Sequence, residues 1–230
     1  MLHPNRLLAS LLPATFEAVK PHLSVVDLKH AAVVAETRGL IERVYFPHSG
    51  IISLVVELKE GDMLETAMVG NDGVLGGASA LDGKVSLNKA IVQAPGVASV
   101  MKVDRVRDLA LAHDDFRSRL IRHEQVLFAT AQQSAACNAS HLVEARLCRW
   151  LLRMRDLLGD YLSLTQEFLG QMIGVRRSSV SLVAGTLQSA GLITYRRGHI
   201  RILNVEGVKE TACECYETVR DHYEMLRGAN

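Results

Sequence analysis

Hydrophobic positions between residues 23 and 103 come in short runs rich in β-branched side chains. Turn-forming residues separate these runs, among them Gly39, the segment 70–73 and Pro95-Gly96. Many short strands with such punctuation are typical of an antiparallel β-barrel or jelly roll. The expected strands are Leu23–Leu28, Ile41–Phe46, Ile51–Leu58, Leu64–Val69, Leu87–Ala94 and Val97–Val103.

Helical patterns flank this β-rich region. Residues 5–20 look helical, with Pro13 as the first residue of a second short helix, a position that proline tolerates. From Asp104 to Leu158 neither Pro nor Gly occurs, and a break near 138–140 separates a long helix from a helix over His141–Leu158. A last helix is expected over Val205–Leu226. The pattern predicts an α+β protein whose domains span residues 1–140, including a long helix at about 105–139, and 141–230.

Residues 164–203 have the layout of a winged helix-turn-helix. Thr165 can cap a first helix, and Gly174 supplies the positive φ that a sharp turn between helices requires. The second helix, about Arg177 to Ala190, carries an apolar stripe at i, i+3, i+4 and i+7, and Gly191 ends it. A strand, a turn and a strand follow over 192–203. Such folds place the second helix in the major groove of DNA.

The charge distribution agrees with this interpretation. Between residues 165 and 203 the sequence contains Arg176, Arg177, Arg196, Arg197 and Arg201 but one acid, Glu167. The whole chain has a net charge of only +1. Because a local basic surface is the electrostatic footprint of phosphate contact, the segment is predicted to bind DNA. The alternative is a solvated loop whose arginines serve solubility.

A stripe with spacing of four and three residues runs along the expected long helix. Small and polar members make it a weak coiled-coil seam, although small residues let two helices approach closely. We expect this stripe to form a dimer interface, and the alternative is a single helix packed on its own barrel. The stripe contains Phe116, Leu120, His123, Leu127, Thr130 and Ser134, followed by Cys137.

The order helix, β-barrel, long helix and winged helix-turn-helix resembles the Crp/Fnr family of bacterial transcription regulators over almost the whole chain. The resemblance is strongest over 164–192, where Gly170-Gln171, Gly174, Arg177 and Val180 match the family pattern. It implies a homodimer that binds two-fold-related double-stranded DNA, with RNA polymerase as a further candidate partner. Arg177 would read a base, because a guanidinium suits guanine O6 and N7. The expected DNA-binding residues are Thr165, Arg176, Arg177, Ser178, Ser179, Ser181, Arg196 and Arg197.

The barrel resembles the family's cyclic-nucleotide-binding domain, with residues 69–78 in place of the phosphate cassette. A working cassette offers an arginine to the cyclic phosphate and a glutamate to the ribose. Here Gly77 stands at the glutamate position and Asn88 at the arginine position, with Lys89 beside it. The resemblance therefore implies a regulator that does not respond to cyclic AMP, unless Lys89 replaces the arginine. The diverged effector pocket would comprise Leu75, Gly76, Gly77, Ala78, Asn88 and Lys89.

Other ligands and functions find less support in the residues. An iron–sulfur sensor of the family needs clustered cysteines, and residues 1–136 contain none. Cys213 and Cys215 would face opposite sides of the last helix, so we expect no metal site. Haem stays an alternative because of histidines such as His22 and His30, but lone histidines are more often surface residues. The sequence thus predicts no cofactor and an effector that is unknown or lacking.

Composition and motifs narrow the remaining function classes. No HExxH, GxSxG, GxGxxG or P-loop pattern occurs, so we do not expect an enzyme. A protein–protein scaffold is a further alternative, although the one-signed arginine face argues against it. No apolar run approaches the ~20 residues of a membrane span, and residues 1–20 lack a signal-peptide pattern. We expect a cytoplasmic protein without a membrane partner.

Overall fold

The computed structural model describes residues 3–83 and 85–228. These divide into two compact units, one of residues 3–54, 67–129 and 223–228 and one of 55–66 and 130–222. The second unit thus includes the tip of a β-hairpin and the last turns of the long helix, which the predicted boundary at residue 140 assigned to the first domain. No helix in the described part of the chain is long and apolar enough to cross a membrane.

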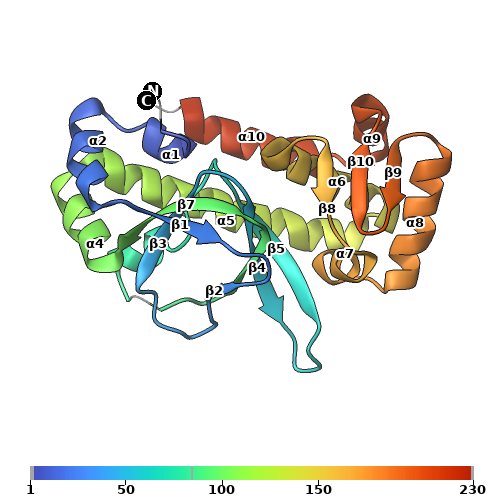
Figure 1. Cartoon of the computed structure of the whole chain (residues 1–230), viewed down its shortest axis with the longest axis horizontal. Helices are drawn as coiled ribbons and strands as arrows, with labels where there is room; N and C mark the ends of the chain where they lie inside the picture. Colours follow the sequence, from blue (N-terminus) through green and yellow to red (C-terminus); the bar gives the residue numbers. More distant parts are fainter. Residues whose placement is uncertain (1–2, 84, 229–230) are drawn as a thin grey trace. The chain divides into compact units, whose positions relative to one another are not determined.

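The first unit begins with short helices and contains antiparallel sheets (Figure 1). Pro13 stands at the first position of α2, as predicted. The helical elements are α1 (Arg6–Ala9), α2 (Pro13–Val19), the 3-10 helix η1 (Lys20–His22), α3 (Gly77–Leu81) and α4 (Val103–Ala112). The strands are β1 (Ser24–Leu28), β2 (Val33–Ala35), β3 (Arg43–Pro47), β4 (Ile51–Glu57), β5 (Met63–Val69), β6 (Lys89–Ala94) and β7 (Gly96–Lys102).

These strands form sheets of order β1-β7-β3 and β2-β6-β4-β5. The pairs β1–β7, β3–β7 and β2–β6 are antiparallel, which confirms the predicted jelly-roll class. Apolar side chains of both sheets share one core, and Leu127 of the long helix α5 (Asp114–Ser140) joins them. The strands contribute unequally to this core: residues 51–55 of β4 are all buried, whereas β1 is mostly exposed.

The second unit holds the predicted winged helix-turn-helix. Its helices are α6 (Val143–Leu158), α7 (Gln166–Ile173), α8 (Arg177–Ser189), α9 (Val205–Thr211) and α10 (Cys215–Gly228), the last of which ends in the first unit. A small sheet of order β8-β10-β9 comprises β8 (Tyr161–Ser163), β9 (Ile193–Arg196) and β10 (His199–Ile202). Trp150 of α6 donates a hydrogen bond from Nε1 to Glu65 Oε1 at 2.8 Å, which joins the β4–β5 tip to this unit.

The C-terminal segment differs from its prediction. A single helix was expected over Val205–Leu226, whereas α9 ends at Thr211 and α10 begins at Cys215. Ala212 caps α9 in an extended conformation, with φ of −70° and ψ of 154°, and this redirects the chain. The orientation of the two nearby cysteines therefore does not follow the helical rule.

Candidate nucleic-acid interface

The turn between α7 and α8 has the geometry that its sequence predicts. Thr165 Oγ1 accepts a hydrogen bond from the Phe168 N–H at 3.2 Å and so caps α7. Gly174 has a φ of 65°, the left-handed conformation expected of a glycine that ends a helix. At Gly170 a Cβ would lie 2.7 Å from the Val175 carbonyl oxygen, so only glycine permits this close approach. These contacts fix the angle at which α8 leaves α7.

One face of α8 packs inward and the opposite face is open. Val180, Ala184 and Leu187 are buried, and Val183 of the predicted stripe is half-buried. Arg177, Ser178 and Ser181 lie on the exposed face near the N-terminus of α8. The face that enters the major groove in this fold is therefore polar and accessible at its N-terminal end.

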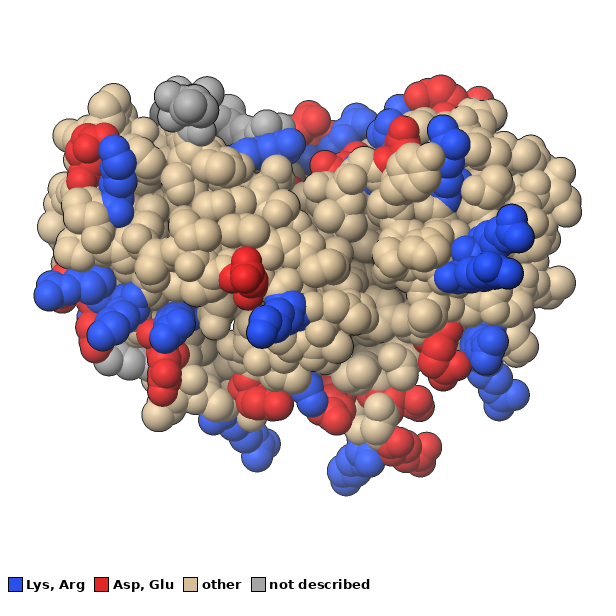
Figure 2. Space-filling view, in the orientation of Figure 1, with Lys and Arg blue, Asp and Glu red and all other residues tan. Residues whose placement is uncertain are grey.

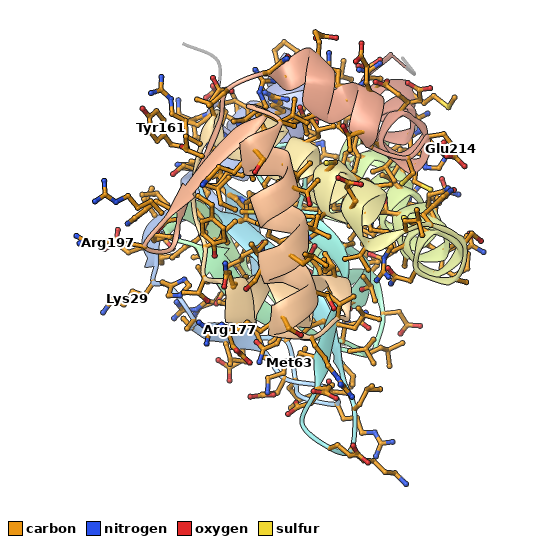
Figure 3. All side chains as sticks on the ribbon, turned by 90° about the vertical axis from the view of Figure 1, so that its right-hand side faces the viewer. Lys29, Met63, Tyr161, Arg177, Arg197 and Glu214 are labelled. Carbon is orange, nitrogen blue, oxygen red and sulfur yellow. The ribbon has the colours of Figure 1, made fainter. Side chains whose placement is uncertain are left out.

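The wing is a hairpin with a two-residue turn at Arg197 and Gly198. Arg196 pairs with His199 across the strands, and the turn residues have φ values of 51° and 80°. Positive φ at both positions is the signature of a type I′ turn, which matches the twist of the strands. The turn places the exposed Arg197 at the tip of the wing (Figure 3).

A groove of about 490 Å³ lies between the start of α7, the start of α8 and the wing. Tyr195 helps to form it, since its hydroxyl donates to the Leu164 carbonyl oxygen at 3.0 Å and its N–H donates to Gln188 Oε1 at 2.7 Å. Burial raises the pKa of the Tyr195 phenol, while the positive charge of Arg177 acts in the opposite direction. The lining residues are Thr165, Gln166, Glu167, Arg177, Tyr195, Arg197 and Gly198.

The surface around this groove is rich in cations. Lys and Arg atoms gather over the wing on the right of Figure 2, where Figure 1 labels β9 and β10. Among the described residues, no ion pair joins Arg176, Arg177, Arg196 or Arg197 to an acid. Arg201 differs, because its guanidinium carbon lies 5.0 Å from the centre of the Tyr161 ring. The exposed arginines are thus available to phosphates, whereas Arg201 is held in a cation–π contact.

The predicted DNA-binding residues do not all contribute in the same way. Thr165, Arg177 and Arg197 line one groove. Arg176 and Arg196 are exposed beside it, whereas Ser179 is half-buried. The Ser181 hydroxyl donates to Gln166 Oε1 at 2.6 Å, so it braces α7 against α8.

Sequence reasoning missed the glutamine contacts of this unit. Gln166 and Gln188 hold Ser181 and the Tyr195 N–H from neighbouring elements. Their only signal in the sequence is a polar side chain within a helical segment, which many surface residues share.

The residues predicted as a dimer seam are buried within a single chain. Phe116 and Leu120 belong to the core under α4, and Leu127 belongs to the core between the sheets. His123 is 1% exposed and accepts a hydrogen bond from the Val74 N–H at 3.4 Å. Farther along α5, Thr130 is buried and the Ser134 hydroxyl donates to the Thr66 carbonyl oxygen at 3.1 Å. The stripe therefore packs on its own chain, as the alternative interpretation expected.

A second stripe on α5 is exposed instead. Its apolar members Ile121 and Phe128 are 43% and 66% exposed. The spacing alternates between three and four residues, the repeat that keeps one helix face toward a partner helix. The exposed members are Ser118, Ile121, Gln125, Phe128, Gln132, Ala135 and Ala139.

The predicted effector residues lie around α3 and the start of β6. Leu75 is buried in the barrel core, and Gly76 takes a φ of 83° at the start of α3. At Gly77 a Cβ would lie 3.1 Å from Leu120 Cδ2 and 3.2 Å from Val74 Cγ1, so a longer side chain requires the packing to shift. Ala78 follows within α3. A glutamate at the Gly77 position, as in a working cassette, would therefore require Leu120 and Val74 to move slightly.

The predicted pocket also differs from a working cassette at the position where the cassette's arginine would bind the cyclic phosphate. Asn88 is exposed, and the Ser86 hydroxyl donates to its carbonyl oxygen at 2.6 Å. Lys89 Nζ lies 3.7 Å from Glu36 Oε2, so a carboxylate already accompanies that ammonium. A bound cyclic phosphate would have to compete with this carboxylate for the lysine.

Comparisons with known proteins identify similar helix-turn-helix domains and similar whole chains. Residues 145–211 match the model of the Crp-like helix-turn-helix domain. A solved structure of FixK2 from Bradyrhizobium japonicum is similar with a TM-score of 0.71 and 15% identity, covering 83% of this chain and 98% of that one. No curated protein matches the sequence.

Further solved structures share the architecture. A transcriptional regulator of the CRP/FNR family from Thermus thermophilus is similar with a TM-score of 0.67 and 23% identity, covering 82% of this chain and 98% of that one. The c-di-GMP responsive regulator CLP from Xanthomonas campestris has a TM-score of 0.65 and 16% identity, with coverage of 82% and 98%. At these identities the likeness establishes the fold.

Proposed function

We propose that this protein is a Crp/Fnr-type transcription regulator that reads two-fold-related DNA as a homodimer, because residues 145–211 match the Crp-like helix-turn-helix domain and the chain shares the fold of solved regulators of that kind. The observation that carries the proposal is the groove between α7, α8 and the wing. Exposed arginines surround it, and no acid pairs with them in the described part of the chain. Such a face binds phosphates by releasing condensed counterions.

The arginines divide into base-reading and phosphate-binding groups by their position. Arg177 is the first residue of α8, the end that approaches base edges in helix-turn-helix proteins. Its guanidinium can donate twice to guanine, which discriminates by about 1–3 kcal/mol. Arg176, Arg196 and Arg197 flank that position and bind the backbone on either side. Thr165 and the N–H groups at the start of α7 supply neutral contacts to phosphate oxygens.

In this proposal, a second copy of the chain packs against the exposed stripe of α5. Ile121 and Phe128 would meet their counterparts across a two-fold axis, and the small Ala135 and Ala139 allow close approach farther along. Each subunit then presents one α8, and the half-sites lie about 34 Å apart. The homodimer thereby accounts for two large apolar side chains that α5 leaves in solvent.

The effector domain is proposed not to respond to cyclic AMP. Lys89 lies beside Glu36, Asn88 carries no charge, and Gly77 offers no carboxylate to a ribose. A ligand shifts a conformational equilibrium only through different affinities for its two states. Regulation therefore comes from another ligand, or the protein binds DNA without an effector. In neither case does the proposed function include catalysis.

The DNA proposal is tested by measuring affinity for a selected site and for random DNA over a range of salt concentrations. Arg176, Arg196 and Arg197 of two subunits make six phosphate contacts, so the logarithm of affinity should fall against log salt with a slope of about −5. Arg177→Ala should cost ~1–3 kcal/mol on the selected site and relax one base position. Arg196→Ala should weaken both DNAs alike and reduce the slope by about two per dimer.

Arg155→Ala is the matched control. Arg155 is an arginine of the same unit, but its Nε already donates to Asp160 Oδ1 at 2.7 Å. Its substitution should leave the salt slope unchanged. Equal losses on selected and random DNA for Arg177→Ala would contradict the base-reading role, and a flat salt dependence would contradict DNA binding altogether.

A further inference from the structure

A cluster of three cysteines and one histidine lies in the second unit, outside the DNA-binding groove. It contains Cys137, His141, Cys213 and Cys215, whose sulfur and nitrogen atoms all lie within 4.8 Å of one another. Cys213 and Cys215 were expected to face opposite sides of a helix. That expectation is wrong, because α9 ends before Cys213 and the turn into α10 directs both thiols to the same side.

Two segments bring these side chains together. Cys137 and His141 are four residues apart, and the His141 N–H donates to the Cys137 carbonyl oxygen at 3.0 Å, so the helical turn continues through them. Side chains at this spacing share one helix face. The α9–α10 turn supplies the other two. The three cysteines are buried, and the His141 side chain is 24% exposed.

Two of the ligand–ligand distances are close to those around one tetrahedral ion, and all of them are within 4.8 Å. Zinc binds sulfur at about 2.3 Å and nitrogen at about 2.0–2.1 Å, so tetrahedral angles separate two sulfurs by about 3.8 Å and a sulfur from a nitrogen by about 3.6 Å. Cys137 Sγ lies 3.5 Å from Cys213 Sγ. Cys215 Sγ lies 3.6 Å from His141 Nδ1. In a [4Fe–4S] cluster each ligand sulfur binds a different iron, so the ligand sulfurs would lie farther apart.

Neighbouring polar groups orient the histidine and the thiolate. His141 Nε2 lies 3.1 Å from Glu214 Oε1, and because a carboxylate accepts, the Nε2–H group donates this hydrogen bond. Nδ1 then carries the lone pair and faces the cysteines, which is the carboxylate–histidine arrangement of many zinc sites. Gln133 Nε2 lies 3.0 Å from Cys215 Sγ and donates to it. The first contact favours a neutral histidine with a free lone pair on Nδ1, and the second favours a cysteine thiolate. These are the forms that bind a metal ion.

Positive charges also lie close enough to act on the thiols. Three thiolates and one neutral histidine leave a net charge of −1 around a divalent zinc ion. Arg149 interacts electrostatically with Cys137, and Arg146 interacts with both Cys137 and Cys213. Arg146 is itself buried. The guanidinium groups of α6 thereby offset the negative charge that a buried metal–thiolate site would carry.

We propose that Cys137, His141, Cys213 and Cys215 bind one Zn²⁺ ion per chain. Four protein ligands complete the coordination sphere, so the ion has a structural role and holds the last turn of α5 to the α9–α10 turn. In Figure 3, Glu214 lies on a different side of this unit from Arg197 at the wing tip, so the site is separate from the DNA-binding groove. The proposal does not depend on the DNA-binding function.

The first experiment measures the zinc content of the full-length protein, purified without chelators under reducing conditions. Elemental analysis should find about one zinc per chain, and Cys215→Ser should lose it. Cys148→Ser is the matched control, because Cys148 is a buried cysteine of the same unit that does not belong to the cluster. Cobalt substitution should give the strong visible bands of a tetrahedral ion and a sulfur-to-cobalt charge-transfer band, both absent from Cys215→Ser.

A second variant protects the test against simple misfolding. Glu214 is exposed on the surface, so Glu214→Gln should fold while the histidine loses its carboxylate partner. Loss of such a partner lowers metal affinity roughly 10- to 100-fold, which competition with a coloured chelator can measure. Glu210→Gln changes an exposed glutamate of α9 and should leave zinc affinity unchanged.

Two results would overturn the proposal, and a third would overturn the role of Glu214 in it. Wild-type protein that contains no zinc and binds cobalt only in octahedral form would show that the cluster is a set of free thiols. A Cys137–Cys213 disulfide in protein isolated from its host would assign the pair to redox chemistry. Equal zinc affinities for Glu214→Gln and Glu210→Gln would remove the role of the carboxylate and with it the proposed histidine geometry.

Discussion

Phe128 offers a direct test of the proposed dimer. Its side chain is 66% exposed in a single chain. Complete burial of a phenylalanine contributes about 1.5–3 kcal/mol, so covering the exposed two-thirds contributes roughly 1–2 kcal/mol per protomer and roughly 2–4 kcal/mol per dimer. Each 1.4 kcal/mol is a factor of ten, so Phe128→Ala should raise the dimer dissociation constant about 30- to 700-fold. Sedimentation velocity over a dilution series measures this change.

Leu120→Ala is the matched control for this prediction. Leu120 lies on the same helix but is 1% exposed and packs in the core with Phe116 and Val74. Its truncation should cost roughly 2–5 kcal/mol of folding stability, seen as a lower melting temperature. The folded fraction should still dimerise. If Phe128→Ala dimerises within about threefold of wild type, the exposed stripe of α5 is not the interface and the reasoning from exposure fails.

Three further predictions concern single sites. Millimolar cyclic AMP should give no measurable heat in calorimetry and no change in DNA affinity, whereas binding tighter than about 100 μM that Lys89→Ala abolishes would refute the interpretation of the pocket. Burial lowers the pKa values of His3 and His48 below 6.5, and the charge of His48 lowers that of His3 further. As the pH falls, both histidines are therefore protonated at a higher pH in the unfolded chain than in the folded one. The folded protein should therefore be most stable above about pH 6.5 and lose stability as the pH falls. In melting curves, His48→Gln should lose less stability at low pH than the wild type. Arg197→Asn should keep or raise the melting temperature, because Asn-Gly suits a type I′ turn, while lowering the salt slope of DNA binding by about two; an unchanged slope would remove Arg197 from the interface.

Several strands could be predicted because glycines with a specific conformational role separate them. Gly50 has a φ of 78° between β3 and β4, and Gly61 has a φ of 88° between β4 and β5. β2 was missed because it has only three residues and its pairing with β6 shifts register between Val33 and Ala35. A strand so short has too little alternation to register as a pattern.

Spacing alone could not show which face of α5 stays exposed, because α5 carries two stripes with the same repeat. One contains Phe116, Leu120 and Leu127, and the other contains Ile121 and Phe128. Both mix apolar with polar members, so periodicity marks the helix but does not say which stripe faces the barrel. Contacts distant in sequence decide this, such as the hydrogen bond from the Val74 N–H to His123.

The cysteine cluster escaped the sequence analysis for a related reason. Residues 205–226 contain no proline, and their one glycine, Gly207, lies inside α9. Nothing local therefore marks the change of direction at Ala212. The break permits the burial of Cys213 and Cys215 beside Cys137, which is a tertiary gain that helix propensity does not report.

At the tip of the wing, the residue present is not the one that the backbone conformation favours. Arg197 takes a φ of 51°, a conformation that costs an L-residue other than glycine, asparagine or aspartate about 1–2 kcal/mol. A hairpin selected only for stability would place asparagine there. The turn instead carries a long cation at its tip, next to the groove that Arg177 lines from the start of α8. Strain at such a position suggests a role for the side chain, and for Arg197 the role that fits our proposal is contact with the phosphate backbone beside the groove.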